Sequence, residues 1–317
     1  MNKYSKIKKL GSGTFGAVYL YQQNETKQQI AVKRAKSGQP SKSEMSCIEV
    51  LKREWELLQL LQSPHIIKAI EYVPQSFDHY LLMEYAPTGD LLEYVNELKA
   101  DKKNVTEAQA WAIFDQLISA LTIVHAAGYV HCDIKLENVL VFSTDNQGFT
   151  IKLTDFGLCS SYSPGQKQCY KTGSLLYSAP EIIEETPVVG PELDVWSLGV
   201  LMFAVVCQRM PFAFDKCRDA IDFQMEYRKR LSVSVKINSH LPAGDFLFQQ
   251  LISQMLQVEP SRRIELDELS QTAWYIGLSK PKGIKLEISK ITHSGPPATD
   301  SPCSFTETPK SAKSDLE

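Results

Sequence analysis

The sequence of 317 residues predicts an α+β protein in which a small, mostly β lobe precedes a larger, mostly α lobe. Short alternating runs separated by glycines and polar turns fill the first part of the chain, as strands joined by loops do. From about residue 106 the apolar residues recur at helical spacing instead. With 43% hydrophobic and 22% charged residues, the composition is that of an ordinary globular protein with a sizeable core.

The amino-terminal lobe is predicted over residues 4–84 and consists of strands around one helix. The helix is expected at 49–62, where apolar residues recur on one face. Strand patterning with β-branched and aromatic residues occurs at 4–13, 17–23, 28–35, 66–73 and 80–86.

The second lobe is predicted over residues 89–276, after a hinge at 84–88. Thr106 followed by Gln109 is a capping-box pattern that starts a helix, and Gly128 suits its end. Residues 194–207 are apolar nearly all round, so this helix is expected at the centre of the core. The tail, 277–317, is rich in Ser, Thr, Pro and Lys and is predicted to be disordered.

Charge and cysteine content exclude several classes of function. A net charge of −3 makes no general case for nucleic-acid binding. The seven cysteines form no C-x-x-C pair, and their odd number does not indicate a disulfide framework. Apolar runs are too short for membrane insertion, and the amino terminus lacks a secretory signal. We therefore expect an intracellular protein, cytoplasmic with the nucleus left open, of undetermined oligomeric state.

A glycine-rich stretch, LGSGTFGAVYL, begins at Leu10. Gly11, Gly13 and Gly16 fit the pattern G-x-G-x-x-G, whose missing side chains let backbone amides approach phosphate oxygens. Strand-like residues follow rather than a helix, so the dinucleotide-binding form of this motif is not indicated. By itself the stretch is equally compatible with an ordinary glycine-rich hairpin.

Lys33 interrupts an apolar strand, IAVKR, and an inward lysine should have a partner. Glu54, in the predicted helix KREWELL, is the expected partner in an ion pair that aims Lys33 at nucleotide phosphates. Taken singly, each residue is more often found on a solvated surface.

Further along, HCDIKLEN supplies Asp133, Lys135 and Asn138, and a D-F-G triplet begins with Asp155. The segment SAPE follows at 178–181. These motifs, in this order after the glycine loop, resemble the eukaryotic protein kinase family of serine/threonine type, over residues 4 to 276. The resemblance implies the bilobal protein kinase fold, ATP and Mg²⁺ as cofactors, and protein substrates with serine or threonine acceptors.

The resemblance also implies roles for individual residues. Asp133 is expected to be the catalytic base, with Lys135 beside it, and Lys33 the phosphate anchor with Glu54 as its partner. Asn138 and Asp155 are expected to bind magnesium. The implied nucleotide-binding residues are Leu10, Gly11, Gly13, Gly16, Val18, Ala31, Lys33, the gatekeeper Met83, the hinge residues Glu84 and Ala86, Asn138 and Asp155.

Structural roles follow from the same resemblance. Glu181 is expected to pair with Arg263. An apolar spine through both lobes is implied for Leu58, Ile70, His131 and Phe156.

Lys135 and Ser174 resemble the pattern that accompanies serine/threonine phosphorylation. Glu137 and Asp90 match acidic positions that select a basic residue upstream of the acceptor, although a solvated-surface role for Asp90 is equally compatible. The layout of the hinge is similar to that of the calmodulin-dependent and energy-sensing kinase groups.

Cys132 stands where most members of the family have an arginine that binds a phosphate on the activation loop. The resemblance therefore implies a kinase that does not depend on a phosphate at Tyr170, Thr172 or Ser174. An alternative is redox control through Cys132, Cys159 or Cys169, with a thiol pKa lowered by Lys135.

Two rival functions remain at this stage. A pseudokinase that acts as a scaffold or allosteric adaptor predicts the loss of at least one of Lys33, Asp133, Asn138 and Asp155, and all four are present. A kinase-fold enzyme that acts on small molecules or lipids is disfavoured by the SAPE segment and the PELDVWSLG run after it.

Overall fold

The computed structural model describes residues 1–35, 46–75, 78–145, 148–170, 173–212 and 245–277. The chain divides into two compact units, of which the first comprises Met1–Pro211 and 235–280. Apart from Phe212, all described residues belong to this first unit. Residues 278–317 of the tail that was predicted to be disordered lie outside the described residues, as does Thr172.

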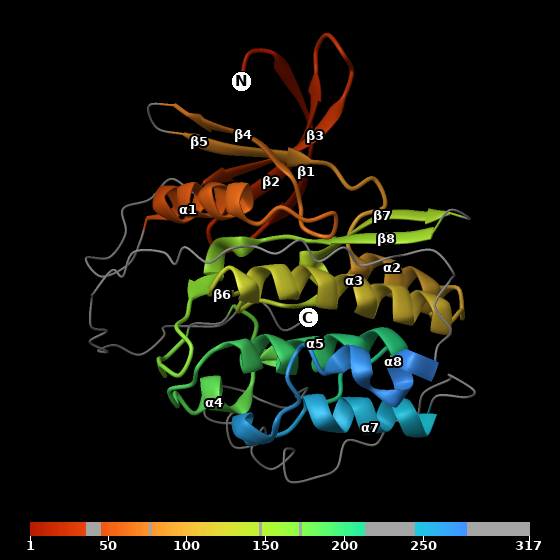
Figure 1. Ribbon diagram of the computed structural model, residues 1–317. Helices are drawn as coiled ribbons and strands as arrows, with labels where there is room; N and C mark the ends of the chain where they lie inside the picture. The colour runs from red at the N-terminus through yellow and green to blue at the C-terminus, as the bar shows by residue number, and fades with distance from the viewer. Residues whose placement is uncertain (36–45, 76–77, 146–147, 171–172, 213–244, 278–317) are drawn as a thin grey trace, which may run out of the picture. The chain divides into compact units, whose positions relative to one another are not determined.

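An antiparallel five-stranded sheet forms the amino-terminal lobe (Figure 1). Its strands, in spatial order, are β1 (Tyr4–Ser12), β2 (Gly16–Gln23), β3 (Gln29–Ala35), β5 (His79–Glu84) and β4 (Ala69–Pro74). The register sets Val18 opposite Lys33 and Ala31 opposite Met83. A Cβ atom on Gly16 would lie 2.4 Å from the Arg34 carbonyl oxygen, so the close approach of β2 to β3 there requires a glycine.

Helix α1 (Cys47–Leu60) contacts β3, β4 and β5. It begins with a capping box between Ser46 and Glu49, in which each side chain accepts from the other residue's backbone N–H. The helix starts and ends two residues before the predicted range, and its inner face buries Glu54, Leu57 and Leu58. The one charged residue on that face is thereby carried into the interior.

The second lobe is mostly helical, and its elements follow the hinge in order (Figure 1). The helices are α2 (Leu91–Ala100), α3 (Glu107–Ala126), α4 (Pro180–Ile183), α5 (Pro191–Cys207), α7 (Asp245–Met255) and α8 (Ala273–Gly277). The short strands are β6 (Tyr129–Val130), β7 (Val139–Asp145), β8 (Gly148–Leu153) and β9 (Ser160–Ser161).

The predicted start of α3 and the predicted core position of α5 are confirmed. Thr106 and Gln109 form the capping box of α3, and Gly128 follows the helix with φ +79°. Helix α5 is buried along most of its length, as its apolar composition requires. Of the helices in the described ranges, α2 is one that the sequence analysis did not anticipate.

Strand β8 ties the two lobes together. The Ile67 N–H donates to the Leu153 carbonyl oxygen at 2.9 Å, and the Leu153 N–H donates to the His65 carbonyl oxygen at 2.9 Å. These bonds fix the segment before β4 against the strand that leads to Asp155. Asp133 and Asn138 lie in the connection between β6 and β7. The segment with these two residues and the segment with Asp155 are therefore each held at the end of a strand.

The prediction that Ile70 belongs to the apolar spine is wrong, because its side chain is 42% exposed. A register shift between Ala69 and Glu71 in the β4–β5 pair turns Ala69 inward instead. The other three residues of the predicted spine are buried, and the rings of His131 and Phe156 meet edge to face at 4.7 Å.

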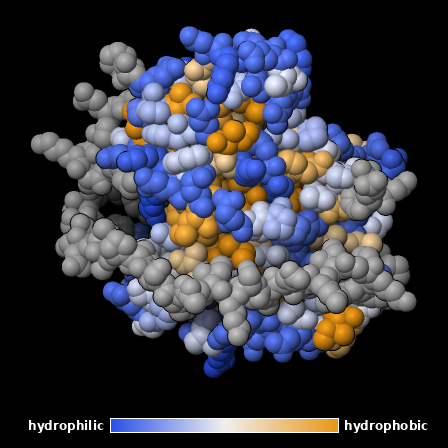
Figure 2. Space-filling view, turned by 45° about the horizontal axis from the view of Figure 1, so that its top comes forward, coloured by the Kyte–Doolittle hydropathy of each residue, from blue (hydrophilic) through white to orange (hydrophobic). Residues whose placement is uncertain are grey.

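Hydrophilic residues make up much of the face drawn in Figure 2, with hydrophobic residues in separate patches. Within the described ranges, no helix combines the length and apolar character that crossing a bilayer needs.

The predicted pair of Glu181 and Arg263 is present and buried. The guanidinium Nη1 donates to Glu181 Oε1 at 2.7 Å and Nη2 donates to Oε2 at 3.0 Å, a bidentate arrangement. Arg263 also donates to the Glu192 and Gln257 carbonyl oxygens and lies over the Trp196 ring at 5.1 Å. The pair therefore joins α4, α5 and the segment after α7.

Replacement of Arg263 by alanine should cost about 3–5 kcal/mol of the free energy of unfolding, because it leaves the Glu181 carboxylate buried without a countercharge. Urea denaturation measures the loss. Arg34→Ala is the matched control, since its ion pair with Asp78 is exposed and its removal should cost at most about 1 kcal/mol. Equal losses in the two variants would contradict the role of the buried pair.

Candidate active site

Lys33 lies between two carboxylates from different parts of the chain. Its Nζ is 2.6 Å from Glu54 Oε2 on α1 and 2.7 Å from Asp155 Oδ1 after β8. The ion pair with Glu54 is the one that the sequence analysis predicted, and the contact with Asp155 adds a second partner. A lysine from β3 thus joins the helix of the first lobe to the end of β8.

Charge at this centre is set by the two carboxylates. Burial by itself lowers the pKa of Lys33, but Asp155 and Glu54 outweigh burial and raise that pKa above its usual value. Burial likewise opposes ionisation of Asp155, whereas the Lys33 ammonium holds the pKa of Asp155 below its usual range. Lys33 is therefore a permanent cation, and Asp155 a carboxylate, at neutral pH.

Asp133 lies buried in the loop between β6 and β7. Its Oδ2 accepts a hydrogen bond from Asn138 Nδ2 at 2.8 Å and lies 3.0 Å from Lys135 Nζ. Its Oδ1 is buried and has no hydrogen-bond partner within the described residues. A buried carboxylate oxygen without a donor is costly, so this atom is suited to receive a hydroxyl group from a bound molecule.

Two residues of the site have left-handed backbone conformations, Cys132 with φ 66° and Asp155 with φ 62°. Such conformations cost energy in non-glycine residues and persist where the surroundings enforce them. At Cys132 the enforcing contact is Asp194 of α5, whose carboxylate accepts the His131 N–H at 2.8 Å and the Cys132 N–H at 3.0 Å.

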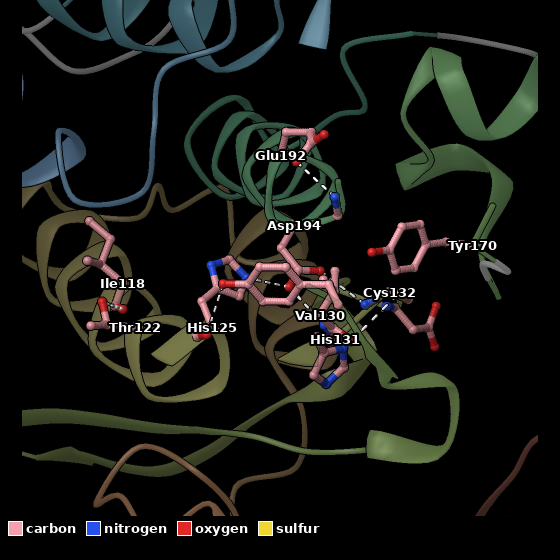
Figure 3. A network of polar contacts seen from close by, with 12 residues as sticks. Ile118, Thr122, His125, Val130, His131, Cys132, Tyr170, Glu192 and Asp194 are labelled. Atoms are coloured by element: carbon pink, nitrogen blue, oxygen red, sulfur yellow. Dashed lines mark hydrogen bonds and ion pairs between the residues drawn. The ribbon is translucent and has the colours of Figure 1, made fainter. Parts of the chain in front are cut away.

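Asp194 lies in the run PELDVWSLG, and the sequence analysis assigned it no role, although it supports the loop that carries Asp133. The carboxylate is fully buried, and its Oδ2 is 2.8 Å from His125 Nε2 (Figure 3). Burial opposes its ionisation, but the hydrogen bond and charge of His125 hold the pKa of Asp194 below its usual range. The signal in the sequence was a carboxylate at the start of the otherwise apolar run 194–207.

Asn138 and Asp155 offer the oxygen donors that a hard cation requires. Asn138 Nδ2 donates to both the backbone oxygen and Oδ2 of Asp133, each at 2.8 Å, which leaves its side-chain oxygen for another partner. Asp155 keeps a side-chain exposure of 39% beside its contact with Lys33. The donor set therefore fits a divalent cation such as Mg²⁺.

Most of the predicted nucleotide-binding residues lie on β1, β2, β3 and β5 of the first lobe or in the turn between β1 and β2. Ala31 and Met83 are paired across β3 and β5, and both are buried. A Cβ atom on Gly11 or Gly13 would meet no other atom within 4 Å, so neither glycine is required by close packing. Leu10 is 40% exposed at the end of β1.

Glu84 and Ala86 lie at the end of β5 and just beyond it. The Glu84 side chain is engaged elsewhere, since its Oε1 accepts from Lys152 Nζ at 2.6 Å and from the Lys68 N–H at 2.7 Å. The Glu84 backbone N–H is engaged as well, because it donates to the Lys68 carbonyl oxygen at 3.1 Å.

Of the residues predicted to govern the choice of acceptor, Lys135 and Ser174 are in contact. Lys135 Nζ donates to Ser174 Oγ at 2.9 Å. Asp90 is the N-cap of α2, where its side chain accepts the Glu93 N–H. Desolvation, together with the charges of Glu93 and Glu137, raises the pKa of the half-buried Asp90 to about 6.

The redox hypothesis for Cys132 and Cys159 finds no support in the geometry. Both thiols are buried, and burial raises the pKa of each, the opposite of the shift that Lys135 was expected to cause. Cys169 is exposed.

Comparison with known proteins gives a consistent family. A family model of the protein kinase domain matches residues 4–275. A carbon catabolite-derepressing protein kinase of Secale cereale is 35% identical over 87% of this chain and 52% of its own length. Serine/threonine protein kinase OSK3 of Oryza sativa subsp. indica is 34% identical over 87% of this chain and 50% of its own. An SNF-related serine/threonine-protein kinase of Rattus norvegicus is 31% identical over 92% and 36%, respectively.

This chain spans about half the length of the first two relatives. The match to the family covers the glycine loop, Lys33, the loop with Asp133 and the triplet at Asp155. The resemblance seen in the sequence is thereby confirmed: the chain belongs to the protein kinase family.

Proposed function

We propose that this protein is a serine/threonine protein kinase, which transfers the terminal phosphate of ATP to hydroxyl groups of protein substrates. The observation that carries the proposal is the placement of Lys33 between Glu54 and Asp155. A charged lysine beside a cation-binding carboxylate is the arrangement that holds a triphosphate. Phosphoryl transfer depends chiefly on such positioning and on neutralising charge.

In this proposal each side chain has one task. Lys33 holds the phosphates, Glu54 fixes Lys33, and Asn138 and Asp155 hold Mg²⁺. The ion, when bound, neutralises negative charge on the phosphates. Gly11 and Gly13 carry no side chain that would keep phosphate oxygens away from the backbone of the loop.

Asp133 is proposed to accept the proton of the attacking hydroxyl through Oδ1, the oxygen left without a partner. Oδ2 is held by Asn138 and Lys135, so the carboxylate has a fixed orientation. A Cβ atom at Gly173 would lie 2.9 Å from Oδ1, so a glycine there avoids a close contact with this oxygen.

The acceptor is proposed to be serine or threonine, because Lys135 and Ser174 are linked beside Asp133. Asp90 and Glu137 are proposed to favour substrates with a basic residue upstream of the acceptor. An intracellular location, with no nucleic-acid partner, remains part of the same proposal.

The pseudokinase alternative is disfavoured by the same contacts. A scaffold has no need for a buried lysine held by two carboxylates, nor for a carboxylate oxygen left unpaired in a strained loop. A mixed peptide array with ATP and Mg²⁺ separates a protein kinase from a pseudokinase and from a small-molecule kinase.

Asp133→Asn should lower kcat by about 10² to 10⁴, because the amide cannot accept the substrate proton. ATP affinity should stay within about threefold, since Lys33, Asn138 and Asp155 remain. Transfer of labelled phosphate and calorimetric titration with ATP measure the two quantities. Asp78→Asn, in an ion pair with Arg34 outside the site, is the control. An Asp133→Asn protein with wild-type turnover would refute the assignment.

Preference for a basic residue should increase between pH 5.5 and 7.5. With a pKa of about 6, Asp90 is protonated at the lower pH and a carboxylate at the higher one, where it attracts a cation. The ratio of kcat/KM for an arginine-containing peptide to that for its alanine analogue should rise about threefold or more. Asp90→Asn should abolish the rise while preserving the helix cap, because asparagine caps as well as aspartate. A rise of the same size in this variant would assign the effect to another group.

A further inference from the structure

Tyr170 is packed against the loop between β6 and β7 that carries Asp133, called the catalytic loop below, and is not exposed to solvent. Its side chain is buried, and its hydroxyl donates to the Val189 carbonyl oxygen. Figure 3 shows the ring beside Cys132, and the pKa of Tyr170 is raised by burial. The residue that the sequence analysis considered as a phosphate acceptor is therefore engaged in its unmodified form.

The turn that receives Tyr170 is itself fixed. Glu192 accepts the Val189 N–H at 3.0 Å and the Gly190 N–H at 2.9 Å, which holds the turn at the start of α5. Gly190 has φ +132°, and a Cβ atom there would lie 2.7 Å from both Tyr170 Cζ and Val130 Cγ2. The ring thus occupies a space that only a glycine leaves open.

The same end of α5 holds the catalytic loop. Asp194, two residues after Glu192, accepts the N–H groups of His131 and Cys132, which directly precede Asp133. Tyr170 and Asp133 are therefore both fixed to one helix end, through Glu192 and Asp194 respectively. The link consists of the Tyr170 ring and hydroxyl, backbone groups, and the carboxylates of Glu192 and Asp194.

Other contacts hold the part of the chain between Asp155 and Tyr170. Gln168 pairs with Val188 through two backbone hydrogen bonds of 2.9 and 3.0 Å, and its side chain donates to the Ser161 carbonyl oxygen. Arg53 of α1 donates to the Cys159 carbonyl oxygen. This part of the chain is therefore held near Cys159 and at Gln168 by hydrogen bonds to backbone carbonyl oxygens.

We propose that unmodified Tyr170 is a positioning residue, which fixes the segment 168–170 against the catalytic loop and replaces an activating phosphate. The inference deepens the proposed kinase function and depends on it. Esterification of the hydroxyl by phosphate would remove the donor to Val189 and bring negative charge close to Glu192. Activity should therefore be complete without a phosphate at this position.

Three variants test the proposal in the full chain. Tyr170→Ala should lower kcat/KM for a peptide substrate at least about tenfold, because it removes both the packed ring and the hydroxyl. Tyr170→Phe keeps the ring and should lose only about threefold to tenfold, the value of one hydrogen bond. Cys169→Ser, an exposed neighbour, should match the wild type. In all three, KM for ATP should change less than about twofold, since Lys33 and Asp155 are untouched.

Phosphatase-treated wild-type protein, with unmodified Tyr170 verified by mass spectrometry, should keep full activity. Circular dichroism melts and ATP titration verify that each variant is folded. Wild-type peptide activity in Tyr170→Ala, or loss of activity on dephosphorylation of Tyr170, would overturn the inference. A wild-type protein without any phosphate transfer would instead refute the proposed function, so the two failures are distinguishable.

Discussion

The contact of Lys33 with Glu54 and Asp155 is the interaction on which the site depends. It places a buried cation between a helix of the first lobe and the end of β8. A buried ammonium is costly unless carboxylates compensate it, so α1, β3 and the Asp155 segment have to adopt mutually consistent positions. The geometry for binding phosphate therefore also fixes the arrangement of these elements.

A second set of contacts fixes the catalytic loop against helix α5. Asp194 holds the backbone of His131 and Cys132, and its own charge is supported by His125. The left-handed conformation of Cys132 persists because two N–H groups converge on one carboxylate. Strain at the loop is thus balanced by hydrogen bonds from the centre of the core, where α5 lies.

The two halves of the site use different physical means. Around Lys33 the elements are joined by full charges, whereas Tyr170 is held by the packing of its ring and by a hydrogen bond to a backbone carbonyl oxygen. Neutral contacts of this kind require close shape complementarity, and Gly190 provides it by leaving room for the ring. In the proposal made above, these neutral contacts hold the segment with Tyr170 in place in a chain that has cysteine at position 132.

The resemblance to the kinase family implied the pair Glu181–Arg263. The sequence by itself determined the strands and the helix of the first lobe, the capping box of α3, the buried helix α5 and the pair Lys33–Glu54. These follow from periodicity and from the need of buried charges for partners, both of which are local or pairwise properties. Only the tertiary structure decided that Ala69 and not Ile70 turns inward, because a shift of register reverses the direction of side chains. It alone also brought Asp194 to the catalytic loop and Tyr170 to Val189, since contacts between segments distant along the chain arise from packing and leave no periodic signal.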